Sequence, residues 1–222
     1  MSTYFCKTGD VPDGTTVIPV KICRPEDIDT VLETLTETQT AYAKSTGFKA
    51  NRGQLLQLPG DDGQVSHIVF GAGSSGYEGS ELLAGKLASD LPRGYYRIDR
   101  APEDWRKNLM AICWGLGAYK FTKYLNNDHT PACLVGDMDD DVCNTVAAIH
   151  MGRNLINTPA GDLGPVALQD AAKALAKRYG AEFRAIIGGD LLAENLPLIH
   201  AVGRAAHQPP RLIELIWGDE KA

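Results

Sequence analysis

Short apolar runs alternate with amphipathic segments through the first 135 residues of the chain. Runs rich in β-branched residues predict strands, and apolar residues spaced three or four apart predict helices. The predicted strands cover residues 15–20, 54–58, 65–70, 95–98 and 132–135. The predicted helices run from 24 to about 47, over 81–91, and from 102 to about 116. This alternation predicts an α/β layered domain, with a β-hairpin where Pro59–Gly63 joins two strands.

The rest of the chain predicts a connecting helix and a second α/β unit. The acidic run Asp137–Asp141 favours a helix N-terminus, and the helix should end near Thr158 because Pro159 disfavours helical geometry before it. Further predicted elements are a helix over 165–179, a strand over 183–187, a short helix ended by Pro197, and strands over 199–202 and 212–217. The expected domains are 1–138, a connecting helix over 139–158, and the incomplete beginning of a second domain over 159–222.

The second unit has only roughly 60 residues, which is marginal for an independent core. An apolar strand over 212–217 would leave an edge that can pair with another copy of the chain. We therefore expect self-association or loss of order in the region after about residue 160.

Charge and cysteine usage disfavour several classes of protein. The formal net charge is −6 and the basic residues are scattered, so nucleic acid is not expected as a partner. No apolar run approaches the ~18 residues of a membrane span, and residues 1–7 lack a signal-peptide pattern. Five cysteines without a Cys-x-x-Cys pair are typical of free thiols in a reducing compartment. We expect a cytoplasmic location and no membrane association.

The segment Gly71–Gly76 has the spacing of a dinucleotide-binding fingerprint. It reads Gly-Ala-Gly-Ser-Ser-Gly between a predicted strand and a predicted helix, and Asp99 lies about 20 residues further on. Two features favour a structural glycine loop instead. The preceding strand is the second arm of the predicted hairpin, and Gly79 indicates that the helix starts beyond the third glycine. Cofactor binding by this loop stays the alternative.

No other set of residues predicts a catalytic or metal site. The acidic run Asp137–Asp141 lacks the glycine and the closing glutamate of a calcium loop, and no Gly-x-Ser-x-Gly sequence occurs. Cys113 and Cys143 are predicted on helices without an activating base. The histidines form no His-x-x-x-His pair and are expected to be packed or surface side chains: His67, His129, His150, His200 and His207. We assign no catalytic, cofactor-binding or metal-ligating residue.

Four segments between about residue 110 and residue 217 carry a resemblance to a known family. They are Gly115–Phe121, Arg153–Ala160, Ala201–Ala206 and Pro209–Leu212. In this order they resemble the leucyl aminopeptidase family of metallopeptidases. The first 100 residues are similar to that family only in general layout.

The resemblance implies an N-terminal α/β domain similar to macro domains, a long helix and a catalytic α/β domain, assembled as cytosolic hexamers. In the family two divalent metals, zinc or manganese, activate the water that attacks the first peptide bond. The metal ligands lie in Lys-containing, Asp-Thr-Gly-Gly and Asn-Thr-Asp-Ala-Glu-Gly-Arg segments, and none of these occurs here. We therefore expect a non-catalytic N-terminal portion of an aminopeptidase that removes N-terminal amino acids from peptides.

Two other functions are weighed against this interpretation. A macro-like domain could act alone and bind a nucleotide diphosphate such as ADP-ribose through Gly71–Gly76. A regulatory DNA-binding role, known for some relatives of the family, is disfavoured by the net charge of −6.

Overall fold

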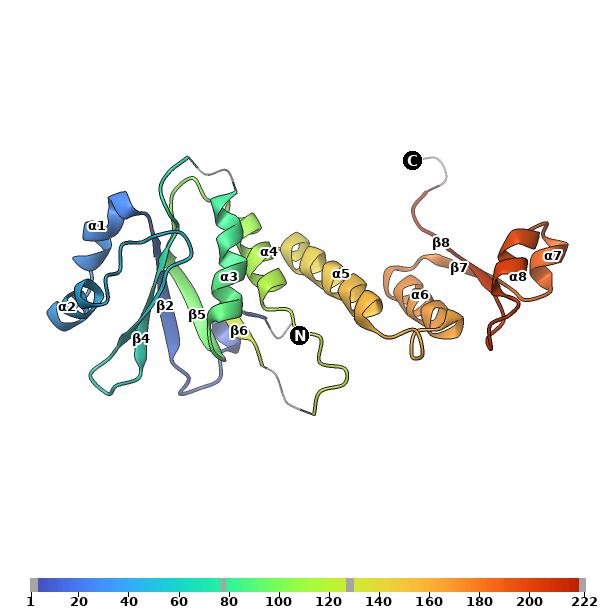
Figure 1. The fold of residues 1–222 in the computed structure, drawn as a ribbon, viewed down its shortest axis with the longest axis horizontal. Helices are drawn as coiled ribbons and strands as arrows, with labels where there is room; N and C mark the ends of the chain where they lie inside the picture. The colour runs from blue at the N-terminus through green and yellow to red at the C-terminus, as the bar shows by residue number, and fades with distance from the viewer. Residues whose placement is uncertain (1–3, 77–78, 127–129, 220–222) are drawn as a thin grey trace. The chain divides into compact units, whose positions relative to one another are not determined.

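The computed structural model describes residues 4–76, 79–126 and 130–219 of the 222-residue chain. The chain divides into two compact units, residues 1–151 (unit 1) and 152–222 (unit 2), and each is described by itself (Figure 1). Both units combine strands with helices, so the predicted α/β class is confirmed. Within the described ranges, no helix is both long enough and apolar enough to cross a lipid bilayer.

Unit 1 is built on a six-stranded sheet of order β1-β6-β5-β2-β4-β3. Its strands are β1 (Phe5–Cys6), β2 (Val17–Cys23), β3 (Leu55–Pro59), β4 (Val65–Gly71), β5 (Gly94–Arg100) and β6 (Ala132–Val135). Neighbouring strands are parallel, except that β3 and β4 form an antiparallel hairpin. Strand β6 is buried along its whole length, which is typical of strands inside a parallel sheet.

Helices pack on both faces of this sheet. They are α1 (Ile28–Leu32), α2 (Glu37–Ser45), α3 (Leu83–Asp90), α4 (Lys107–Gly117) and α5 (Asp140–Asn157). Buried side chains of α3, α4 and α5 form one apolar cluster with Ile68 and Phe70 of β4. Those of α1 and α2 form a second cluster with Val69. Because successive strand residues point to opposite faces, the two clusters lie on opposite sides of the sheet.

Helices α3 and α4 approach each other where two glycines meet. A Cβ atom added to Gly117 would lie 1.9 Å from the carbonyl oxygen of Gly85, so a larger residue fits only if the backbone moves. Nearby, Trp114 is fully buried and donates its indole N–H to the carbonyl of Ala132 at 3.2 Å. The core of unit 1 therefore depends on close backbone contact as well as on large side chains.

Unit 2 contains an antiparallel strand pair and short helices. Its elements are α6 (Pro165–Tyr179), β7 (Glu182–Ile187), α7 (Asp190–Ala193), α8 (Pro197–Gly203) and β8 (Arg211–Ile216). Gly180 ends α6 in the left-handed conformation, with φ of +67°. Among the described residues of this unit, only Ala176, Ile186 and Leu191 are buried. Unit 2 therefore has a much smaller core than unit 1.

Several predicted elements are confirmed by the structure. The predicted hairpin is β3–β4, the long helix after the acidic run is α5, and the helix over 165–179 is α6. The helix predicted from residue 24 to Gly47 is instead divided. A 3₁₀ turn and α1 come first, and Thr36 then adopts an extended conformation and starts α2 in a capping box with Gln39.

Two further predictions are wrong, and proline or turn geometry explains both. The helix predicted to open at Pro102 begins at Lys107, because Pro102 and Trp105 close a turn through a backbone hydrogen bond of 3.0 Å. The predicted strand over 199–202 is helix α8. Pro197 begins this helix instead of ending the previous one, because the first helical turn needs no backbone N–H donor.

Candidate functional site at the carboxyl edge of the sheet

The carboxyl ends of β2, β4 and β5 form the best-placed candidate site in unit 1. Strand β2 lies between β4 and β5, so the segments that follow these three strands lie side by side (Figure 1). The segments are 24–27, 71–76 and 101–106. In open α/β sheets, ligands bind in the crevice outside such strand ends. This edge is therefore where a ligand of the glycine loop would have to bind.

The backbone amides of Gly71–Gly76 are largely engaged within the chain. Four N–H groups donate to internal acceptors: Gly71 to the Gln54 carbonyl (2.8 Å), Ala72 to the Cys23 carbonyl (2.8 Å), Gly73 to the Ala50 carbonyl (3.2 Å) and Ser75 to Oε1 of Glu26 (3.0 Å). A diphosphate would need such amides as donors. Three of these amides therefore already donate to the chain's own backbone, and the fourth donates to a carboxylate.

The glycines of this loop are needed for close packing. A Cβ atom on Gly71 would lie 2.1 Å from the carbonyl oxygen of Asn51. Gly73 has φ of +76°, and a Cβ atom there would lie 2.9 Å from that of Arg52. The helix also starts beyond the third glycine, as expected, with a 3₁₀ turn over Ser80–Leu82. The geometry thus supports the structural interpretation of the glycine spacing.

Asp99 does not occupy the position that a dinucleotide fingerprint requires. It lies on β5, which β2 separates from the strand that carries the glycine loop. Its carboxylate accepts a hydrogen bond of 2.7 Å from Nε of Arg97 on the same strand. The residue is therefore paired within its own strand and takes no part in the loop.

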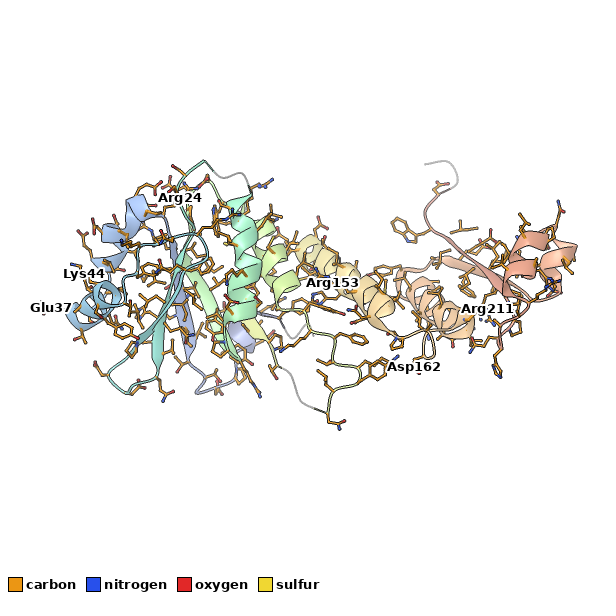
Figure 2. All side chains as sticks on the ribbon, in the orientation of Figure 1. Arg24, Glu37, Lys44, Arg153, Asp162 and Arg211 are labelled. Carbon is orange, nitrogen blue, oxygen red and sulfur yellow. The ribbon has the colours of Figure 1, made fainter. Side chains whose placement is uncertain are left out.

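Charged side chains join the segments after β2, β4 and β5. Arg24, labelled in Figure 2, lies in the segment after β2. Its Nη2 donates to both carboxylate oxygens of Asp104, at 2.6 and 2.8 Å. The hydrogen bond from Arg24 lowers the pKa of Asp104, and the Ser75 amide lowers the pKa of Glu26. Both carboxylates are thus held ionised at neutral pH. The Arg24 guanidinium and the Ser75 amide thus each already hold an internal anion.

A second pair of contacts extends this network to the start of α3. Nε1 of Trp105 donates to Oγ of Ser80 at 2.7 Å, and both residues are buried. Arg106 donates to Oε1 of Glu81 at 2.7 Å, and the pKa of Glu81 is lowered by a hydrogen bond from its own backbone and then by this one. These contacts hold the segment after β5 against the segment after β4. Sequence analysis missed them, although charged residues directly after predicted strands were a visible signal.

The histidines and the acidic run form no metal site in the described residues. Nε2 of His150 lies 3.0 Å from the carbonyl oxygen of Gly115, and the imidazole packs between the rings of Tyr4 and Tyr119. Nδ1 of His67 lies 3.1 Å from Oγ of its neighbour Ser66. His129 lies outside the described residues, and His200 and His207 lie in unit 2.

The carboxylates that follow β6 are also used locally, since Asp139 accepts a hydrogen bond of 2.7 Å from Nδ2 of Asn108. No three His, Cys, Asp or Glu side chains converge on a common point in the part of the chain that the structure describes. These residues therefore do not fit a two-metal centre.

Three cysteines line a hollow of about 620 Å³ beside β1 and β6, together with Lys7 and Arg93. They are Cys6, Cys133 and Cys143. Burial raises the pKa of the Cys133 thiol to about 12 and also raises that of Cys6. Neutral thiols are weak nucleophiles, so Cys6 and Cys133 are poorly suited to act as catalytic nucleophiles. Sequence analysis missed this grouping because β1, which carries Cys6, is only two residues long.

Comparison with known proteins places this fold in a class. The family model described as the N-terminal domain of M17 aminopeptidases matches residues 18–136, and the model for the cytosol aminopeptidase catalytic domain matches residues 150–222. The two matches follow each other along the chain, in the order of an N-terminal domain and then a catalytic domain. The chain belongs to the M17, or cytosol aminopeptidase, family. The resemblance seen in the sequence is thereby confirmed.

Individual relatives agree with this assignment. The chain is 26% identical over 195 residues to the probable cytosol aminopeptidase of Corynebacterium efficiens, covering 81% of this chain and 39% of the relative. A crystal structure of the cytosol aminopeptidase from Coxiella burnetii matches with a TM-score of 0.81 and 30% identity, over 98% of this chain and 47% of that one. The chain thus spans less than half the length of these relatives.

A second solved structure supports the fold alone. The bottromycin maturation enzyme BotP, in a complex with Mn, has a TM-score of 0.69 and 24% identity, over 91% of this chain and 45% of that one. The described part of the fold is therefore shared with enzymes that differ widely from it in sequence.

Proposed function

We propose that this chain provides the N-terminal domain, the connecting helix and the opening elements of the catalytic domain of a leucyl-type aminopeptidase. In that role it acts as a scaffold and carries none of the metal-binding or catalytic residues. The proposed domains are residues 1–138, the connecting helix 139–158 and the beginning of the catalytic domain over 159–222. The boundary between the two compact units falls inside this helix, which supports its role as connector.

The observation that carries this proposal is the extent of the catalytic-domain match. That match covers residues 150–222, while the whole chain covers 47% of the Coxiella burnetii enzyme. The described residues also bring no three potential metal ligands together. Metal binding and peptide-bond hydrolysis are therefore expected from parts of the catalytic domain that these 222 residues do not include.

The complete enzyme is proposed to remove N-terminal amino acids from peptides in the cytoplasm as a homo-oligomer. Two divalent metals, zinc or manganese, would supply the activated water and polarise the scissile carbonyl. The names of the cytosol aminopeptidase relatives support the proposed activity, and the Mn complex of BotP supports a divalent metal. Nothing in the charge distribution favours nucleic acid as a partner.

The proposal is tested by assaying the purified 222-residue chain on a leucyl chromogenic substrate with added Mn²⁺ or Zn²⁺. We expect no release of chromophore above the rate in buffer, because no ligand set is present to hold the metals. The full-length Coxiella burnetii enzyme, assayed in parallel, controls for the substrate and the metal. Metal-dependent hydrolysis by the chain that a chelator abolishes would contradict the proposal.

A further inference from the structure

Sulfur-bearing side chains gather at one place in unit 1. The hollow of about 620 Å³ beside β1 and β6 is lined by three of the five cysteines of the chain and by one of its four methionines. These residues are Cys6, Cys133, Cys143 and Met138. Thiolates and thioethers are the ligands that soft metal ions such as Cu(I) prefer. The lining of the hollow therefore favours a soft metal ion.

The strand pair β1–β6 places Cys6 and Cys133 on the same face of the sheet. Cys6 pairs with Val135 across the two parallel strands, and Cys133 precedes Val135 by two residues. Paired residues, and every second residue of a strand, share one face. Leu134, between Cys133 and Val135, instead belongs to the apolar cluster on the other face. The two thiols are therefore neighbours across this strand pair.

The two thiols are also in direct contact. Burial is the main cause that raises the pKa of both thiols, and the Cys133 thiol in addition donates a hydrogen bond to the sulfur of Cys6, which lowers the pKa of Cys6 and raises that of Cys133. The Cys6 thiol in turn donates to the carbonyl oxygen of Lys7, with Sγ and O 3.4 Å apart. A proton held between two sulfur atoms occupies the place that a linearly coordinated metal ion would take.

The number of thiols in contact limits the class of metal. Within residues 4–76, 79–126 and 130–219, no three His, Cys, Asp or Glu side chains converge on a common point. Structural Zn²⁺ takes four ligands, whereas Cu(I) is stable between two thiolates. A Cu(I) ion with two thiolates carries a single negative charge. Lys7 and Arg93 also line the hollow and outnumber Asp10 there, so the charge of the lining complements that of the bound ion.

We propose that Cys6 and Cys133 form a Cu(I) site in unit 1, which is independent of the aminopeptidase function proposed above. Binding is a proton exchange in which two Cu–S bonds form, both S–H bonds break and two protons pass to solvent, while copper and sulfur keep their oxidation states. Neutral thiols are suited to this exchange, because a coordinating thiol is deprotonated by the metal. The ion would also tie the two-residue strand β1 to β6, its only described strand partner.

The test titrates the fully reduced 222-residue chain with Cu(I), without oxygen, in competition with a chromogenic Cu(I) chelator. We expect a single tightly bound ion, a thiolate-to-copper charge-transfer band in the ultraviolet, and a higher melting temperature, because the ion binds the folded strand pair. Zn²⁺ under the same conditions should not raise the melting temperature. Absence of a bound Cu(I) ion, or equal stabilisation by Zn²⁺, would overturn the proposal.

Cysteine variants make the test specific to this pair. Cys6→Ser and Cys133→Ala should each weaken Cu(I) binding by at least about 100-fold, the upper limit for losing a residue outside the ligand shell. Cys23→Ala is the matched control, because Cys23 is a buried cysteine of the same sheet away from the hollow, and it should leave the affinity unchanged. An equal loss in Cys23→Ala would show that binding follows the total thiol content and would overturn the assignment.

A further variant separates a two-thiol site from a larger one. Cys143 lines the hollow from α5 and not from the strand pair, so Cys143→Ser should keep the tightly bound ion. A loss as large as that in Cys6→Ser would overturn the two-thiol site. Circular dichroism of each variant without copper establishes that it is folded. Cys6→Ser, at a partly exposed position, keeps the test decisive if Cys133→Ala is destabilised.

Discussion

The two units of this chain use apolar residues in opposite ways. In unit 1, Trp114 is fully buried and every strand of the sheet contributes to a core on one face or the other. In unit 2, Trp217 is 75% exposed, and only three described residues are buried. Both units are rich in apolar side chains, so composition does not explain the difference. The two units differ in how many helices and strands pack on their sheets and cover the apolar side chains.

Sheet size accounts for this contrast in physical terms. Unit 1 has six strands, with helices on both faces, so each apolar residue finds a neighbouring layer. Unit 2 has one strand pair and only three buried residues among those described, and a pair of strands with so small a core is marginally stable in water. We therefore expect unit 1 to fold on its own and unit 2 to be stabilised by a partner.

The largest expected effect comes from truncating the two tryptophans in turn. Trp114→Ala should lower the free energy of unfolding of unit 1 by about 3–5 kcal/mol, because it leaves a cavity and removes the indole hydrogen bond to the Ala132 carbonyl. Trp217→Ala should change stability by less than about 1 kcal/mol, because its side chain is already in water. Urea unfolding followed by far-ultraviolet circular dichroism, to which both units contribute, measures each effect. Similar losses would mean that Trp217 is covered in solution.

A smaller effect is expected from acid, and it should act on unit 1. The folded-state pKa values of Asp104 and Glu26 lie below their ordinary values of 3.8 and 4.5. A lowered folded-state pKa stabilises the folded chain above the ordinary pKa, and this contribution is lost as the pH falls through the lowered value. The melting temperature of unit 1 should therefore fall below about pH 4.5.

Removing one of these carboxylates should flatten that pH dependence. Asp104→Asn is expected to destabilise unit 1 slightly at pH 7 and to reduce the further loss on acidification, because the Arg24 contact no longer titrates. Asp13→Asn, an equal charge change in an exposed turn, is the matched control and should leave the profile unchanged. A melting profile that is the same for all three proteins would show that the Arg24–Asp104 contact contributes nothing to stability.

The sequence predicted the elements whose turns and ends are marked by residues within the element itself. The β3–β4 hairpin and helix α6 carry their own turn and end signals, Pro59–Gly63 and Gly180, so they could be located without tertiary information. Strand β1 could not be located in this way, because two residues are too few to show an alternating pattern and their only described strand partner is β6. Helix α8 was predicted as a strand because residues 199–202, Ile-His-Ala-Val, form a short and mostly apolar run. So short a run fits the periodicity of a helix and of a strand equally well.

The candidate site was less predictable than the fold. Sequence analysis favoured a structural role for Gly71–Gly76 from the hairpin and the late helix start, and the internal amide contacts agree with that interpretation. The contact between Arg24 and Asp104 joins residues 80 positions apart, so it depends on the strand order β4-β2-β5. Strand order is a tertiary property that local patterns do not determine.

The smallest expected effect concerns nucleotide diphosphates at the carboxyl edge of unit 1. Titration of the chain with ADP-ribose or NAD in a calorimeter should give no saturable heat. A diphosphate would have to displace the Glu26 carboxylate from the Ser75 amide and the Asp104 carboxylate from Arg24. The amides of Gly71, Ala72 and Gly73 already donate to backbone carbonyls. Saturable binding by the chain that Glu26→Gln tightens would contradict this expectation. It would mean that the internal carboxylates only compete with the ligand, and that unit 1 differs from unit 2 in having a functional site of its own.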